Sequence, residues 1–578
     1  MLKQRKLIKG FMFASLFTIA LSACGQGGET EGAGTNGGAQ PAPPTTVDAP
    51  AGHDPRAFQP VPAGDWNTPF EYPVVVTVAT ELGVNWNFAG TDTMFDSPWT
   101  RLFRDELNIH LEFDFVAIDD YETRLQMAIA ADNLPDVFSI PMSIQRTFNQ
   151  LQQAGTLLDL THAYNNYTSQ RIRDFKLTDP YTIEVYTVDG RIYALPRYYY
   201  GQIDQPWHLW VRKDWHEAEG SPEIRTVADL ENLARAFMNN HGAAYGISVD
   251  NTLQFLFRTA PMFGAYLGNI HDSQYFWRPD DTGRLRPGIA FPEFMVALEY
   301  WQRWFAEGII SPDFTAMGPW DTTHEDVVNG RVGIQPWWQW WGWMNGANIV
   351  SLQHNDAYFI PFNFPTVDGS RPARGQTFFP NMGIIAAHRD FQNPAALMKI
   401  VSMVDHMVAS PDANLTPDQI NYFMADGREH GMGPVFHMID PLSDMLQYVY
   451  INRALETGDA SQLFTTNMVV KHSEIVGWLN NQYPPGALGA FLQLGFPNAA
   501  YGRSQHLFDN GWIVQNSLWG ALPEEFDQAG LTGDMILEEV MLIVMGVNPV
   551  SHFETVLANW YAQGGQIKED AVNLHFGR

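Results

Sequence analysis

Aromatic side chains are the residues of this chain whose type and spacing most suggest a chemistry. The segment 335–343, QPWWQWWGW, places five tryptophans within seven positions. An indole ring has a large apolar face and one N–H donor, so it can cover the C–H face of a sugar ring. The hydroxyls at the rim of such a ring need polar partners. Carbohydrate binding by stacking is therefore the first function that the sequence suggests.

The geometry of the segment supports this interpretation. We expect a helix that has Pro336 in its first turn. At 100° per residue the five rings would cover about 220° of arc, whereas the buried stripe of a surface helix needs only about 100°. One packed face cannot hold them all, so some should line a cavity, a cleft or an interface. The candidate stacking residues are Trp337, Trp338, Trp340, Trp341 and Trp343.

Other candidates lie in segments that should be loops or strand ends. Each of them could instead be an ordinary core or hinge residue. The aromatic candidates are Tyr198, Tyr199, Trp207, Trp210 and Trp86, and the polar candidates are Asp136, Gln335 and Arg197.

Catalytic patterns give little support to an enzyme. His216-Glu217 begins like a zinc-protease motif but lacks the second histidine four positions after the first. The sequence contains neither a GxSxG elbow nor a phosphate-binding GxxxxGK[ST] loop. Glycosidase carboxylate pairs have no fixed spacing, so a surface glycosidase or lyase stays open as the alternative. A surface adhesin is a third possibility. We expect no enzyme activity, no catalytic residue and no cofactor or metal.

The N-terminus carries an export signal. Basic residues precede an apolar run from Phe11 to Leu21 that is too short to span a bilayer. Leu21-Ser22-Ala23-Cys24 resembles the lipobox of bacterial lipoproteins, which implies a signal peptide over 1–23 and lipidation of Cys24. Residues 24–69 are rich in Gly, Pro, Thr and Ala, and we expect a disordered tether. The protein should therefore be anchored by lipid at the extracytoplasmic face of the cell membrane.

The charge balance limits the partners. The chain has 34 basic and 64 acidic residues, a net charge of −30, and the mature chain loses four basic residues and reaches −34. Such a field disfavours nucleic acid as a partner. Cys24 is the single cysteine, so no intramolecular disulfide can form and packing must stabilise the fold.

The elements after the tether predict a parallel sheet. Residues 72–78, 109–116 and 136–140 have strand patterns, while 97–107 and 121–131 have helix patterns, with Ser97 as a cap and Pro98 in the first turn. This β-α-β-α-β order is typical of a sheet covered by helices. Ligands of such sheets bind at the carboxyl ends of the strands, and we place the corner before Asp136 at such an end.

Several segments further along resemble one family, the extracellular solute-binding proteins (family 1, sugar-type) of bacterial ABC importers. The resemblance rests on the order and spacing of these segments and covers most of the mature chain. They include 131–136 (ADNLPD), 190–196 (GRIYALP), 210–215 (WVRKDW), 226–230 (TVADL) and 307–313 (EGIISPD). The resemblance implies a two-lobed α/β fold of the periplasmic-binding-protein type (type II), with parallel-sheet lobes joined by a hinge that the chain crosses more than once.

This resemblance also implies function and domain limits. Lobe one should contain residues 70–195 and 377–440, and lobe two residues 200–376 and 441–578. The protein should bind a saccharide, an oligosaccharide in view of its aromatic surface, and deliver it as a monomer to the transmembrane subunits of an ABC permease. Many large members bind calcium after the helix that corresponds to 226–238. Here that stretch, 239–246 (NNHGAAYG), has no carboxylate, so we expect no calcium there.

Overall fold

A computed structural model gives the fold of most of the chain. The described residues are 50, 52–81, 92–117, 120–141, 146–179, 181–197, 206–269, 274–318, 322–343, 357–377, 383–409, 436–438, 440–482, 486–518, 522–523, 525–526 and 533–577.

Residues 74–196 and 384–387 contribute to a five-stranded sheet of order β2-β1-β3-β15-β6. Its strands are β1 (Val74–Glu81), β2 (Ile109–Ala117), β3 (Val137–Ile140), β6 (Ala194–Pro196) and β15 (Ile384–Ala387). β1 is parallel to both β2 and β3, and β15 returns from late in the chain to lie antiparallel between β3 and β6. The predicted parallel β-α-β-α-β unit is confirmed, including the Ser97 side chain as the cap of the first helix.

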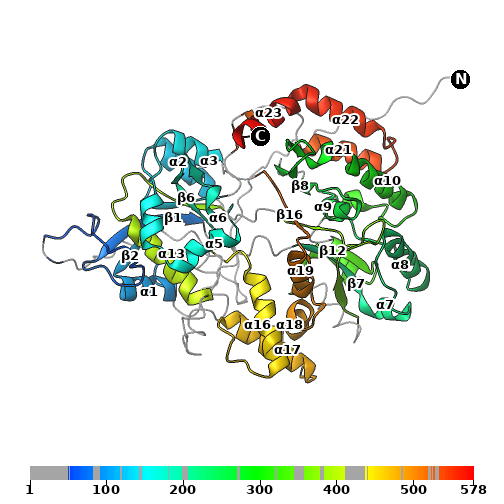
Figure 1. The fold of residues 1–578 in the computed structure, drawn as a ribbon, viewed down its shortest axis with the longest axis horizontal. Helices are drawn as coiled ribbons and strands as arrows, with labels where there is room; N and C mark the ends of the chain where they lie inside the picture. The colour runs from blue at the N-terminus through cyan, green and yellow to red at the C-terminus, as the bar shows by residue number, and fades with distance from the viewer. Residues whose placement is uncertain are drawn as a thin grey trace, which may run out of the picture. The chain divides into compact units, whose positions relative to one another are not determined.

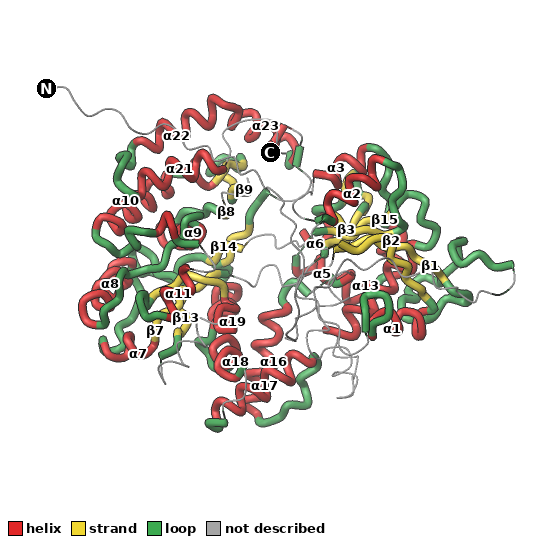
Figure 2. Tube along the Cα trace, turned by 180° about the vertical axis from the view of Figure 1, so that it is seen from behind, coloured by secondary structure: helices red, strands yellow, loops and turns green. Residues whose placement is uncertain are grey.

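Helices cover both faces of this sheet (Figures 1 and 2). Alternate residues of β15 face opposite cores, Ile385 and Ala387 on one side and Ile384 and Ala386 on the other, as the period of a strand requires. The helices of this part are α1 (Pro98–Leu107), α2 (Tyr121–Ala130), α3 (Arg146–Gln153), α4 (Thr161–Tyr167), α5 (Gln170–Thr178), α6 (Tyr181–Glu184) and α13 (Pro394–Ala409). A small ladder joins β4 (Thr187–Val188) to β5 (Arg191–Ile192).

The structure corrects the end of the predicted tether. Residues 52–73, which we call the strap, lie on the sheet and on α13 instead of being disordered. The Pro55 carbonyl accepts a hydrogen bond from Val75 N at 3.0 Å. Val75 lies in the part of β1 that precedes its pairing with β3, which begins at Val78. Lys399 of α13, whose side chain is 1% exposed, donates to the Thr68 carbonyl at 2.8 Å and pairs with Asp65 at 3.3 Å. Composition alone missed the strap because these bonds come from residues far along the chain.

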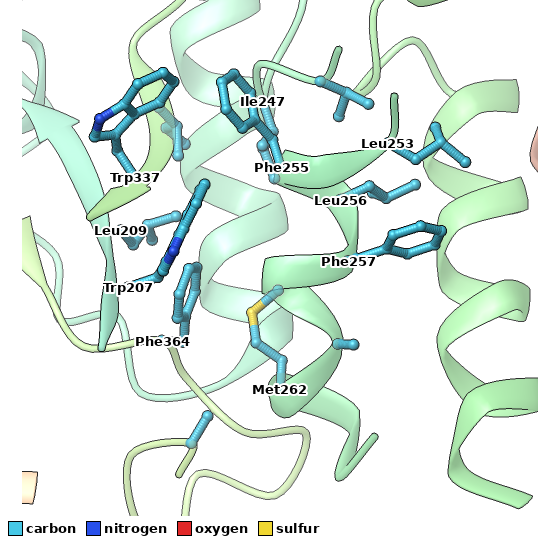
Figure 3. Close-up of a cluster of buried hydrophobic side chains, with 14 of the residues drawn as sticks. Trp207, Leu209, Ile247, Leu253, Phe255, Leu256, Phe257, Met262, Trp337 and Phe364 are labelled. Atoms are coloured by element: carbon cyan, nitrogen blue, oxygen red, sulfur yellow. The ribbon is translucent and has the colours of Figure 1, made fainter. Parts of the chain in front are cut away.

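The second part of the chain is built on a smaller antiparallel sheet of order β12-β7-β13. These strands are β7 (Trp207–Arg212), β12 (Ile334–Trp338) and β13 (Phe359–Phe362). Every residue of β7 is buried, because strands flank it on both sides and the large aromatic core lies against it. Figure 3 shows part of that core, with Trp207 and Trp337 beside Phe255 and Phe364.

Helices and short ladders complete this second part. Three of the helices, α16 (Ser443–Thr457), α17 (Thr466–Leu479) and α18 (Ala487–Leu494), lie side by side in Figure 1. The helices are α7 (Lys213–Ala218), α8 (Val227–Asn240), α9 (Gln254–Thr259), α10 (Pro292–Ala306), α11 (Thr322–Val328), α16 (Ser443–Thr457), α17 (Thr466–Leu479), α18 (Ala487–Leu494), α19 (Ala500–Asp509), α21 (Gly533–Val544), α22 (His552–Trp560) and α23 (Gln566–His575), with single turns η2 (Ala260–Phe263), η3 (Gly288–Ala290), η4 (Phe314–Ala316), η5 (Gln339–Trp343) and η8 (Tyr561–Gly565). The strand pairs are β8 (Gly268–Asn269) with β9 (Gln274–Tyr275), β10 (Trp277–Pro279) with β11 (Leu285–Pro287), and β14 (Gly375–Thr377) with β16 (Ile513–Gln515).

The buried apolar residues gather in separate cores. One large core takes its members from 207–373 and 451–572, and the two cores on either side of the five-stranded sheet take theirs from 70–195 and 384–438. We use lobe one and lobe two for these two parts, and the lobe limits given above stay a prediction. Among the described residues, none of the helices has the length and apolar character needed to cross a membrane.

The strap should contribute to stability through Asn393, which is 2% exposed. Its Oδ1 accepts from Gln59 N at 2.8 Å, and its Nδ2 donates to the Ala57 carbonyl at 2.9 Å. Asn393→Ala should therefore lower the free energy of unfolding by about 2 kcal/mol, measured by urea denaturation, and should speed proteolysis within the strap. Gln392→Ala, a change at the exposed neighbour, is the control. Equal stability of the two variants would contradict this role of the strap.

A buried ion pair links α5 to α13 in lobe one. Arg171 Nε lies 3.1 Å from Asp405 Oδ2, and its Nη2 lies 3.3 Å from Asp440 Oδ2. Burial raises the pKa of the Asp405 carboxyl to about 6, although Arg171 opposes this and Asp440 adds to it. Burial, aided by the charge of Arg171, lowers the pKa of His437 to about 3, so this imidazole is neutral.

The Asp405 carboxyl should make stability depend on pH. Its folded pKa lies above the unfolded value of about 3.9, so its protonation stabilises the fold fully below about pH 4, and this contribution is lost as the pH rises through about 6. The free energy of unfolding of the wild type, minus that of Asp405→Asn, should thus fall by up to about 3 kcal/mol between pH 4 and pH 7. Urea unfolding of both proteins at each pH measures this difference. If the difference in the free energy of unfolding between the two proteins is the same at both pH values, the pKa of Asp405 is not raised in the folded protein.

Candidate functional site

The tryptophan segment forms a strand and a turn, not the helix that we predicted. β12 runs through Pro336 to Trp338, and the single 3-10 turn η5 follows it. Among the described residues β12 is an edge strand that pairs with β7, with Pro336 opposite Leu209. An edge strand tolerates proline because its outer side has no ladder bond to lose. Pro336 was therefore a misleading helix-start signal.

This geometry sorts the tryptophan candidates by exposure. Trp207 is 3% exposed, Trp337 and Trp341 are 1% exposed, and Trp210 is fully buried. These four side chains belong to the core of lobe two. Trp338 and Trp340 are only partly buried against the same core.

The partly exposed pair continues an aromatic row that begins in the core. The Trp207 and Trp338 ring centroids are 4.3 Å apart, and Trp338 and Trp340 stack at 5.3 Å with 17° between their planes. The guanidinium of Arg258 on α9 lies 4.9 Å from the Trp207 centroid and 6.0 Å from that of Trp338. A cation over the ring faces favours this packing. No sequence signal singled out Arg258, because it lies about eighty residues before Trp338.

Hydrogen bonds fix the backbone on which the pair stands. Trp210 Nε1 donates to the Trp338 carbonyl at 3.1 Å, and Gln493 Nε2 of α18 donates to the Trp340 carbonyl at 2.8 Å. Gly342 allows α18 to approach this closely, since a Cβ there would lie 3.3 Å from Leu492 Cβ. The rings are thus held in place before any ligand arrives. We call Trp338 and Trp340 the indole pair.

A second group of polar atoms lies at the carboxyl edge of the sheet in lobe one. Glu81 ends β1 and Arg197 follows β6, and their side chains meet with Nη2 3.0 Å from Oε1. Arg197 is 7% exposed, and its backbone N donates to the Gly383 carbonyl at 3.0 Å, where β15 begins. In the part of the chain that the structure describes, Nε and Nη1 of Arg197 have no hydrogen-bond partner. Open α/β sheets bind ligands at this edge.

Glu81 was not among the predicted residues, although its position as the last residue of the first strand was a usable signal. Gln335, which was predicted, is 2% exposed in β12, and its Nε2 makes a long contact of 3.5 Å to the neighbouring Pro336 carbonyl.

The placement of Asp136 is a correction. It precedes β3 and so lies at the amino end of the strand, not at the carboxyl end where we expected it. Its Oδ2 accepts from Thr77 N at 2.8 Å and from Thr77 Oγ1 at 2.7 Å. These bonds satisfy β1 just before its pairing with β3 starts at Val78. The carboxylate thus has a structural task on the edge opposite Arg197.

Some predicted residues cannot be placed. Tyr198, Tyr199, Trp86 and Cys24 lie outside the described residues, and Trp343 ends η5 with a side chain that is also outside them. Among the described residues, no three or more His, Cys, Asp or Glu side chains gather as a metal site would require. The absence of calcium after α8 stays a prediction.

Comparison with known proteins identifies the family. The family model described as bacterial extracellular solute-binding protein matches residues 86–389, which is more than half of the chain. The chain belongs to this family. Solved structures of the extracellular solute-binding type share its fold, so the predicted two-lobed α/β fold of the periplasmic-binding-protein type is confirmed.

Two solved structures illustrate that likeness. An extracellular solute-binding protein from Bifidobacterium longum subsp. infantis has a TM-score of 0.56 at 14% identity, over 87% of this chain and 98% of that one. The alginate-binding protein AlgQ2, without calcium ion, has a TM-score of 0.54 at 14% identity, over 90% of this chain and all of the other. At these identities the likeness concerns the fold alone.

Sequence relatives match this solute-binding protein over shorter stretches. The polygalacturonan/rhamnogalacturonan-binding protein YtcQ of Bacillus subtilis (strain 168) is 22% identical over 233 residues, which are 39% of this chain and 44% of the relative. Lipoprotein LipO of the same organism is 21% identical over 252 residues, 41% of this chain and 46% of that one. The match thus spans less than half the length of these relatives.

The burial pattern predicts losses of stability of different size within the tryptophan segment. Trp337→Ala should lower the free energy of unfolding by about 3–5 kcal/mol, because it empties a closed core position, while Trp340→Ala should cost clearly less. Urea denaturation followed by far-ultraviolet circular dichroism measures both. Equal losses would show that Trp340 is a core residue like Trp337.

Proposed function

We propose that this solute-binding protein captures a carbohydrate, specifically an oligosaccharide, and delivers it intact to an ABC permease. The observation that carries the proposal is the indole pair, two stacked and partly exposed rings on a rigid support. Flat rings of this kind cover the C–H faces of sugars. The density of aromatic residues in this segment favours an oligosaccharide over a monosaccharide.

Polar groups for the hydroxyls come from lobe one. Arg197 and Glu81 bring a donor and an acceptor to the carboxyl edge of its sheet. The proposed closure of the two lobes on the ligand would select the bound shape that a permease recognises. We propose that the lipid on Cys24 keeps the protein at the membrane beside that permease, and that it works as a monomer.

The relatives support a carbohydrate as the ligand. YtcQ is named for binding polygalacturonan and rhamnogalacturonan, and AlgQ2 for binding alginate, all of them acidic polysaccharides. Another protein of the same fold, from Bifidobacterium longum infantis, is described as an HMO-binding solute-binding protein, with a TM-score of 0.54. Oligosaccharides of both acidic and neutral composition therefore belong in the test.

The test is calorimetric titration of residues 25–578 with oligogalacturonate, rhamnogalacturonan, alginate and neutral oligosaccharides, followed by mass spectrometry of each mixture. Binding with intact sugar would support the proposal. Shortened products would show the alternative, a polysaccharide-degrading enzyme. Absence of any binding across the panel would overturn the carbohydrate assignment.

Trp340→Ala should weaken binding of the saccharide by about 30-fold, that is by about 2 kcal/mol, because one stacking face is lost. Trp512→Ala, which removes another partly exposed indole after α19, is the matched control and should bind like the wild type. Unchanged affinity in Trp340→Ala would exclude the indole pair from the site.

A further inference from the structure

Gln339, the residue between the two rings of the indole pair, is tied to a distant helix. Its side chain is fully buried, and its Nε2 donates to Asp444 Oδ2 at 3.3 Å. Asp444 lies in the first turn of α16 and is 7% exposed. Its other oxygen accepts from Gln447 Nε2 at 3.4 Å, one turn further along the helix.

The backbone bonds at Trp338 and Trp340 come from within lobe two, from Trp210 and Gln493. The Gln339 side chain adds a third bond, and this one reaches a carboxylate on α16. Gln339 is the single residue between the two rings. A change in its backbone dihedral angles therefore changes the orientation of both rings relative to each other. A hydrogen bond between two buried side chains holds that orientation, because breaking it would leave both polar groups unsatisfied.

The same end of α16 is also attached to lobe one. Asp440 accepts from Leu442 N through Oδ1 at 2.9 Å, and its carbonyl accepts from Ser443 N at 2.9 Å, so it shapes the start of the helix. Its Oδ2 meets Arg171 of α5 at 3.3 Å, and Arg171 is held in turn by the buried Asp405. Asp440 follows Phe436 and Met438, which belong to a core of lobe one.

We propose that Asp444 is a positioning residue for the indole pair, and that Asp440 connects the start of α16 to lobe one through Arg171. The start of α16 then couples the indole pair to lobe one. The inference rests on the proposed function for its ligand. Gln339 and Asp444 touch no sugar in this scheme; they set the orientation of the rings that do. Movement of α16 together with lobe one would then change the orientation of the indole pair. A sugar bound to the indole pair would in turn favour one position of α16.

The first test concerns positioning. Asp444→Leu removes the acceptor and should weaken saccharide binding by about 10-fold, while Asp444→Asn, which keeps an acceptor oxygen, should stay within about 3-fold of the wild type. Asp444→Leu should also change the exciton signal of the stacked indoles in circular dichroism. This signal is assigned to the indole pair by its loss in Trp340→Phe. Gln339→Met removes the donor of the same bond and should have the same effects as Asp444→Leu. It is the second test of this bond if Asp444→Leu folds poorly. Asp459→Asn, a matched change beyond the far end of α16, should alter neither readout.

The second test concerns coupling. Asp440→Asn, which weakens the pair with Arg171, should reduce affinity alone but add little on top of Asp444→Leu, because both act through the same turn. Additive losses would overturn the coupling. Unchanged affinity and an unchanged exciton signal in Asp444→Leu and Gln339→Met would overturn the positioning role. A wild-type protein that binds no saccharide would defeat the proposed function, yet the exciton signal would still decide whether Asp444 orients the pair.

Discussion

The pairing of β12 with β7 is the constraint on which the rest of lobe two depends. Antiparallel pairing fixes the register, with Trp337 opposite His208 and Trp338 opposite Trp207, and a strand must turn alternate side chains to opposite faces. Trp337 is buried in the core, whereas Trp338, the last residue of the strand, stays partly exposed.

The two edges of the sheet in lobe one differ in how their polar groups are satisfied. At the amino edge, Pro55 and Asp136 satisfy the N–H groups of Val75 and Thr77 that precede the pairing with β3. At the carboxyl edge, Arg197 and Glu81 meet across the ends of the intervening strands. The amino edge is thus filled by the chain itself, while the carboxyl edge keeps donors of Arg197 that no described residue uses.

Local signals were enough to predict much of lobe one. The Ser97 cap, the proline that follows it and the strand patterns are properties of short segments, so β1, α1, β2, α2 and β3 could be read from the sequence. What could not be read depends on distant partners. Pro336 looks the same at a helix start and in an edge strand, and only the presence of β7 decides between them. The strap likewise resembles a tether in composition, and Asn393 and Lys399 are what order it.

The same limit applies to the candidate site. Tryptophan density drew attention to the segment, but the exposed fraction of each ring depends on the core built by α9, α18 and β7. Asp136 shows the converse error, because no sequence signal indicated that Thr77 would bind its carboxylate. Glu81 and Asp444 were overlooked since their partners, Arg197 and Gln339, lie more than a hundred residues away.

The strap also decides where force enters the molecule. For a chain anchored through Cys24, any pull from the membrane would reach lobe one at the amino edge of its sheet, where the strap is bonded, and would not act directly on lobe two. The load would arrive at the start of β1, whose eight residues separate it from the carboxyl edge by about 25 Å. During the proposed closure of the lobes, lobe one would then stay in place, and lobe two with its indole pair would move. Attachment and ligand would occupy opposite ends of one strand.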